Sequence, residues 1–169
     1  MPDPELLVRR AAVSDAAGIA RVQVRAWQSA YRGQIPGRIL DSLDETTRAA
    51  RWLESIPQAG HVLHVAVHDD TVIGFCSFIR SRDPDSNDGT GEIAAVYVAP
   101  GRWRSGIGRA LVEASLDEAR TRGYREVTLW VLASNQLGRG FYERLGFAHD
   151  GETKMEALQG CELHEVRYR

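Results

Sequence analysis

The segment between residues 92 and 132 constrains the fold more than any other part of the chain. Residues 92–99 are β-rich and apolar on both faces, which is typical of a central strand that is covered on both sides. Residues 106–122 have the periodicity of an amphipathic helix ended by Gly123, and residues 126–132 form a second apolar strand. A strand–helix–strand unit with short loops makes its two strands parallel, with a right-handed crossover.

Hydrophobic periodicity predicts the remaining elements on both sides of this unit. A hairpin over residues 61–79, with Asp69-Asp70 at its turn, makes the neighbouring strands antiparallel. Ser14 is the expected N-cap of the first helix. The order β-α-α-β-β-β-α-β-α-β-β therefore predicts an α/β protein with a mixed sheet of about seven strands and about four helices. The other predicted elements are strands at 6–10, 147–152 and 162–168, and helices at 15–32, 46–56 and 136–145.

Length and composition exclude several classes of protein. The 169 residues are expected to form a single domain, residues 1–169. Lys and Arg number 21 against 23 Asp and Glu, so the chain lacks the basic surplus of a general nucleic-acid binder. The longest apolar run, residues 93–99, is far shorter than the ~20 residues needed to span a membrane. Two cysteines cannot form a disulfide framework, and a cytoplasmic enzyme or binding domain remains.

The loop before the 106–122 helix carries the chemistry. Gly106 and Gly108 have no Cβ, so a ligand can approach the backbone and the unpaired N–H groups of the first helical turn. With the positive end of the helix dipole, these N–H groups make a site for phosphate. Three nearby arginines suggest more than one phosphate charge: Arg102, Arg104 and Arg109. The alternative is a glycine-containing turn that binds nothing.

Two common phosphate motifs do not fit this loop. A P-loop requires a lysine after its last glycine, and none follows here. The dinucleotide fingerprint requires a third glycine, where this chain has Leu111. A nucleotide binder of Rossmann type therefore stays only as an alternative.

Two segments together resemble a known family. RSGIGRAL at residues 104–111, after the strand that ends in VYV at 96–98, resembles motif A of the GNAT superfamily of N-acetyltransferases. NQLGRGFYERLGF at residues 135–147 resembles motif B of the same family. The resemblance covers about residues 5–168 and implies the GNAT-type acyl-CoA acyltransferase fold. The chain departs from the family pattern at Trp103, where Gln or Arg is common, and at Gly138, where Ala is usual.

The resemblance implies acetyl-CoA as the cosubstrate and a primary amine of a small molecule or peptide as the acceptor. It assigns the diphosphate to the glycine loop and the pantetheine arm to residues 96–98, which would pair with it like an added strand. Asn135 begins the motif B helix as an N-cap and is also expected to contact the cofactor. The cofactor-binding residues implied are Val96, Tyr97, Val98, Arg104, Ser105, Gly106, Ile107, Gly108, Arg109 and Asn135.

The family also implies a direct transfer without an acetyl-enzyme intermediate. Tyr142 occupies the position of the general acid that protonates the leaving thiolate, the alternative being a tyrosine that only packs in the core. Glu92, at the head of the central strand, is the candidate base for the acceptor ammonium, whose pKa is near ~10.4. A water chain or a merely solvated Glu92 are the alternatives.

The acceptor side is poorly specified by the sequence. Trp27 and Tyr31 lie where the family's first helices wall the acceptor cleft, although aromatic residues at this spacing also serve as core. The strand positions of His61, His64 and His68 do not favour a metal site, because they do not share one face. No membrane or nucleic-acid partner is expected. The family is often dimeric, which admits a homodimer, and a non-catalytic acyl-CoA-binding sensor domain is the alternative function.

Overall fold

The computed structural model describes residues 6–169, which form one seven-stranded sheet and five α-helices. The strands are β1 (Leu7–Arg10), β2 (Val62–His68), β3 (Thr71–Arg80), β4 (Thr90–Val98), β5 (Glu126–Leu132), β6 (His149–Leu158) and β7 (Cys161–Tyr168). The helices are α1 (Ala16–Ala30), α2 (Gly37–Asp41), α3 (Glu45–Ser55), α4 (Ile107–Thr121) and α5 (Gln136–Arg144).

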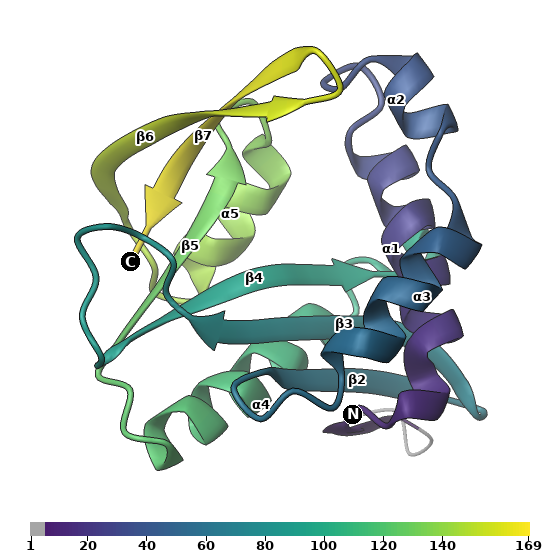
Figure 1. The fold of residues 1–169 in the computed structure, drawn as a ribbon, viewed down its shortest axis with the longest axis horizontal. Coiled ribbons are helices and arrows are strands. Elements are labelled where there is room, and N and C mark those ends of the chain that lie inside the picture. Colours follow the sequence, from purple (N-terminus) through teal and green to yellow (C-terminus); the bar gives the residue numbers. More distant parts are fainter. Residues whose placement is uncertain (1–5) are drawn as a thin grey trace.

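The sheet is mixed, as the sequence predicts. Its strand order is β1-β2-β3-β4-β5-β7-β6, and only the β4–β5 pair is parallel. This pair is joined by α4, so the predicted strand–helix–strand crossover is confirmed. In Figure 1, β2, β3 and β4 run side by side, whereas β5, β6 and β7 turn away from them.

Helices cover both faces of the sheet because its strands bury alternate side chains on opposite sides. On β2, Ala66 packs in the same apolar cluster as Leu111 of α4. Its neighbour Val65 packs instead with Ile19 of α1. No helix of residues 6–169 has both the length and the apolar character to span a membrane.

The two central strands separate halfway along their length. The parallel pairing covers only Thr90–Ile93 of β4 and Glu126–Leu129 of β5. Beyond it, β4 continues along β3 to Val98, and β5 continues along β7 to Leu132. The register between β3 and β4 shifts at Ser77/Phe78 and leaves Ala94 as an extra residue in β4. Such a bulge bends its strand and increases the local twist, which helps to open a wedge between β4 and β5.

The structure corrects several details of the predicted elements. Ser14 is not an N-cap, since it lies inside a 3-10 turn, Val13–Asp15, and α1 starts after Asp15. The short α2 is an additional helix. The last hairpin is longer than predicted, because β6 extends to Leu158. Asp69 and Asp70 both have positive φ (48° and 59°), as in the type I′ turns that connect twisted hairpins.

Candidate functional site

A cavity of about 1220 Å³ opens at the wedge between β4 and β5. It is lined by these two strands, by the beginning of α4, by α5 and α1, and by the β6–β7 hairpin. Pockets for one small ligand usually measure about 300–1,000 Å³, so this cavity has room for two reactants. All of the site residues predicted from the sequence line it: Trp27, Tyr31, Glu92, residues 96–98 and 104–109, Asn135 and Tyr142.

One end of the cavity is the start of α4. Gly106 is the N-cap residue in a left-handed conformation (φ 84°), and no side chain caps this helix. The first intrahelical bond runs from the N–H of Ala110 to the carbonyl of Gly106 (3.0 Å), so the N–H groups of residues 107–109 have no partner within the helix. Arg104 also has a positive φ (61°), an uncommon conformation for a residue with a side chain. The loop therefore directs unpaired amides toward the cavity.

Four arginines surround this end of the cavity: Arg102, Arg104, Arg109 and Arg144. The Arg109 guanidinium is held by the Glu113 carboxylate (3.2 Å) and by the carbonyl of Arg144 (3.3 Å). Ser105 donates its hydroxyl to the carbonyl of Arg102 and thereby tightens the loop. Arg144 was not among the residues predicted, because only the docking of α5 beside α4 brings it to this site.

The two motif glycines serve different purposes. A Cβ on Gly106 would meet no heavy atom within 4 Å, so packing does not require glycine here. Glycine is favoured by the positive φ and by the space that it leaves open for a ligand in the cavity. A Cβ on Gly108 would lie 3.1 Å from Cζ of Phe141, so this glycine lets α5 pack against α4. The absence of a side chain at Gly138 likewise makes room for the Asn135 amide, whose nitrogen would lie 2.5 Å from an added Cβ.

Residues 96–98 form the β4 edge of the wedge. The N–H of Ala99 bonds to the carbonyl of Ile73 on β3 (2.8 Å). Since backbone groups alternate in direction along a strand, the N–H and C=O of Val98 and Val96 point into the wedge. The indole N–H of Trp103 donates to the carbonyl of Val98 (2.8 Å). The Val98 N–H stays unpaired at the cavity, because the β4–β5 pairing ends at Ile93. Trp103 thus has a defined contact in place of the usual Gln or Arg.

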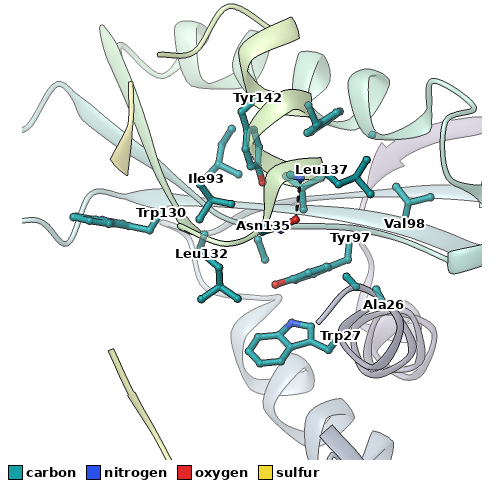
Figure 2. A pocket seen from close by; sticks show the side chains of 18 of the residues that line it. Ala26, Trp27, Ile93, Tyr97, Val98, Trp130, Leu132, Asn135, Leu137 and Tyr142 are labelled. Atoms are coloured by element: carbon teal, nitrogen blue, oxygen red, sulfur yellow. Dashed lines mark hydrogen bonds between the residues drawn. The ribbon is translucent and has the colours of Figure 1, made fainter. Parts of the chain in front are cut away.

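Tyr142 extends from α5 toward β4, as Figure 2 shows. Burial raises the pKa of its hydroxyl well above the usual value, with smaller contributions from Tyr31 and Cys76. No other residue between 6 and 169 hydrogen-bonds to this hydroxyl, so it is available to a ligand. Asn135 is confirmed as the N-cap of α5, because its side-chain oxygen accepts the N–H of Gly138 (3.0 Å).

Aromatic side chains from α1 and β4 form another wall of the cavity. Figure 2 shows Trp27 of α1 next to Tyr97 of β4. The Tyr31 and Tyr97 hydroxyls are 3.3 Å apart, and the Trp27 ring packs edge-on against Tyr31 with centroids 5.1 Å apart. Burial is also the main cause that raises the pKa of both tyrosines. Trp27 and Tyr31 therefore contribute to core packing and to the cavity wall together.

Glu92 is buried, with 2% of its surface exposed, and the interpretation of this residue as a solvated carboxylate is wrong. Its two oxygens accept hydrogen bonds from Arg82, one from the guanidinium (2.5 Å) and one from the backbone N–H (3.2 Å). The carboxylate thereby holds the β3–β4 loop, residues 81–89, against the sheet. Both side chains line the cavity.

Sequence reasoning missed a further wall made by β5, β6 and β7. Trp130 donates its indole N–H to Asp83 (3.0 Å), and the Lys154 ammonium lies 4.4 Å from the Trp130 ring centroid. Lys154 is also 3.8 Å from the Glu156 carboxylate. Glu165 of β7 completes this wall. Alternation along the last strand indicates on which face of the sheet Glu165 lies. Only the pairing of β7 with β5 brings this residue to the wedge.

Neither the three histidines of residues 61–68 nor Cys76 line the cavity, although His68 contacts Arg102, which does. His61 bonds to the Ser77 hydroxyl (2.7 Å), and His64 bonds to the Ser115 hydroxyl (3.1 Å) on the other face of β2. Cys76 is fully buried, and burial raises its pKa to about 12. Within residues 6–169, no three His, Cys, Asp or Glu side chains are grouped so as to hold a metal ion.

Comparison with known proteins agrees with this geometry. The sequence model of the acetyltransferase (GNAT) family matches residues 23–147. YuaI, an uncharacterised N-acetyltransferase of Bacillus subtilis (strain 168), is 32% identical over 164 residues, which cover 94% of this chain and 89% of that protein.

Two solved structures establish the likeness of the fold. One is PaiA N-acetyltransferase from Thermoplasma acidophilum in complex with coenzyme A, with a TM-score of 0.76 and 21% identity over 95% of this chain and 97% of that one. The other is yncA from Salmonella typhimurium with acetyl-CoA, with a TM-score of 0.71 and 23% identity over 97% and 92% of the two chains. The predicted GNAT-type fold is confirmed, and the chain belongs to the GNAT family of acetyltransferases.

Proposed function

We propose that this protein transfers the acetyl group of acetyl-CoA directly to a primary amine of a small molecule or peptide. The observation that carries the proposal is the cavity in the β4–β5 wedge, which joins an uncapped helix start to the unpartnered hydroxyl of Tyr142. Two structural neighbours were solved with coenzyme A or acetyl-CoA bound, which supports the choice of cosubstrate.

The donor would bind along motif A. Its diphosphate accepts hydrogen bonds from the amides of residues 105–109, with the charges of Arg104 and Arg109 nearby. Its pantetheine amides pair with the wedge-facing backbone of Val96 and Val98, while Tyr97 supports the strand from the other face. Asn135 lines the thioester end. When bound, acetyl-CoA would supply the activated acetyl carbonyl.

The wedge offers what acyl transfer requires. The tetrahedral intermediate carries an oxyanion, and the unpaired N–H of Val98 or a neighbouring amide is the donor that faces it. The Tyr142 hydroxyl is protonated at neutral pH, as a tyrosine is even at its ordinary pKa of about 10, and it can donate its proton to the leaving thiolate. Neither step needs a metal ion or a covalent acetyl-enzyme.

The acceptor ammonium must lose a proton before it attacks. Glu92 is the base predicted from the sequence, with a water chain as the alternative, and its ion pair with Arg82 holds both of its oxygens. Trp27 and Tyr31 would contact the acceptor. The proposal describes a cytoplasmic enzyme without nucleic-acid or membrane partners, active as a monomer or a homodimer.

A panel of amines with acetyl-CoA, followed by release of free thiol, tests the activity. We expect at least one primary amine to give thiol release, and Tyr142→Phe to lower kcat by ~100-fold or more without weakening acetyl-CoA binding. Tyr124→Phe is the matched control, since Tyr124 packs on Phe78 outside the cavity. Binding of acetyl-CoA without turnover on any amine would instead support the sensor domain.

A further inference from the structure

The cavity contains a second carboxylate whose environment differs from that of Glu92. Glu165 projects from β7, opposite Leu132 of β5 and Lys154 of β6. It lies on the same face of the strand as Leu163, two residues earlier, and both line the cavity. This position brings Glu165 to the wall formed by β5, β6 and β7, across the wedge from β4.

The two carboxylates differ in their partners. Both oxygens of Glu92 accept hydrogen bonds from Arg82. The backbone of Glu165 pairs with β5 and β6 and its side chain is half-buried, yet no group of residues 6–169 donates a hydrogen bond to its carboxylate or forms an ion pair with it. A general base needs a free lone pair within reach of the proton that it removes. The Glu165 carboxylate meets this requirement with all of its lone pairs free, whereas each oxygen of Glu92 already accepts one hydrogen bond from Arg82.

The electrostatic surroundings of Glu165 also suit a base. Burial raises its pKa above the usual value, and the carboxylates of Glu156 and Glu92 raise it further. Lys154 and Arg82 act in the opposite direction without cancelling the increase. A carboxylate with a raised pKa is a stronger proton acceptor than an ordinary glutamate.

Glu165 lines the same cavity as the proposed acid, Tyr142. Its charge contributes to the raised pKa of Tyr31, after burial as the main cause. The Tyr31 hydroxyl is 3.3 Å from that of Tyr97. The Glu165 carboxylate therefore shares one cavity with this tyrosine pair and with Tyr142.

We infer that Glu165 is the group that removes the proton from the acceptor ammonium, directly or through one water molecule. This inference rests on the proposed acetyl transfer. The ammonium gives one proton to Glu165, and the neutral nitrogen then forms a bond to the thioester carbon while the C=O electron pair moves to oxygen. When this electron pair re-forms the C=O bond, the C–S bond breaks and the leaving thiolate takes the proton of the Tyr142 hydroxyl. The second nitrogen proton restores Tyr142, directly or through one water molecule, and Glu165 releases its proton to solvent.

The test is the pH dependence of kcat at saturating acetyl-CoA and amine. Wild-type kcat is expected to fall as the pH drops through the raised pKa of Glu165. Glu165→Gln is expected to lower kcat by ~100-fold or more and to lose this acidic limb, with an unchanged Kd for acetyl-CoA. Glu165→Asp keeps the limb at a reduced rate, which a purely structural role would not produce.

Two controls separate the outcomes. Glu162→Gln, on an exposed position of the same strand outside the cavity, should keep the wild-type profile. The inference about Glu165 is overturned, while acetyl transfer stands, if Glu165→Gln keeps the wild-type kcat and acidic limb. It is also overturned if Glu92→Gln removes the acidic limb and Glu165→Gln does not. If the wild-type protein acetylates no amine, the proposed function and this inference fail together.

Discussion

Replacing Gly106 by alanine separates ligand binding from the stability of the fold. The residue has a φ of 84°, and a left-handed conformation costs a residue with a Cβ about 1–2 kcal/mol. Alanine recovers about 0.4–1 kcal/mol by restricting the unfolded chain. Because the new Cβ meets no atom within 4 Å, no steric clash adds to the cost. We therefore expect Gly106→Ala to lose about 1 kcal/mol, a decrease in Tm of roughly 2–4 °C for a chain of this size.

Gly123→Ala is the matched control at the other end of α4. Gly123 has a φ of 90° and equally open surroundings, but it lies outside the cavity. Both variants should lose the same stability without ligand. The assay is the thermal shift with acetyl-CoA at 100 times the wild-type Kd, which adds about 2.7 kcal/mol to a protein that binds normally.

In Gly106→Ala the methyl group occupies the space where the diphosphate would approach. A tenfold weaker Kd, equal to about 1.4 kcal/mol, reduces the ligand stabilisation to about 1.4 kcal/mol. Gly123→Ala should keep the full shift. Equal ligand shifts in the two variants would refute the assignment of the diphosphate to this loop.

Two further perturbations test local contacts. Asp15 accepts hydrogen bonds from Arg9 (2.7 Å) and from the N–H of Ala12 (2.7 Å), and the Arg9 bond is the main cause that lowers its pKa. Its stabilisation is therefore present above the unfolded pKa of about 3.9 and is lost as the pH falls through the lower folded pKa. Asp15→Asn should lose about 1–3 kcal/mol at pH 7 in urea unfolding, and a difference from wild type that does not shrink in acid would contradict this. Trp103→Phe frees the Val98 carbonyl for the pantetheine, so calorimetry should give a lower Kd for acetyl-CoA, and a higher Kd would show that the indole itself binds the cofactor.

Periodic patterns predicted most elements within a residue or two, because burial of one face acts through nearby residues. The predicted strand 126–132 has the same bounds as β5, and α4 begins and ends one residue inside the predicted range. The N-cap was misassigned to Ser14 because a 3-10 turn, Val13–Asp15, precedes α1, and the Asp15 carboxylate accepts the N–H of Ala12 at its start. The end of β6 was missed because this strand is mostly exposed and shows no apolar alternation.

The two motifs were sufficient to predict one part of the cavity lining, from residues 96–98 to Tyr142. These residues lie on consecutive elements around α4, so their spacing along the chain carries their geometry. The partners of Glu92 and Trp103 could not be predicted. Each depends on how a loop folds over the end of the sheet, which local patterns do not encode.

The sequence by itself determined the family, the mixed sheet and the loop whose amides face the cavity, because these depend on local spacing. Only the tertiary structure decided which carboxylates line the cavity. Glu165 and the start of α4 are far apart along the chain, and they share one cavity because β7 pairs with β5 where β5 leaves β4. That arrangement results from the pairing of distant strands, whose order no single segment specifies.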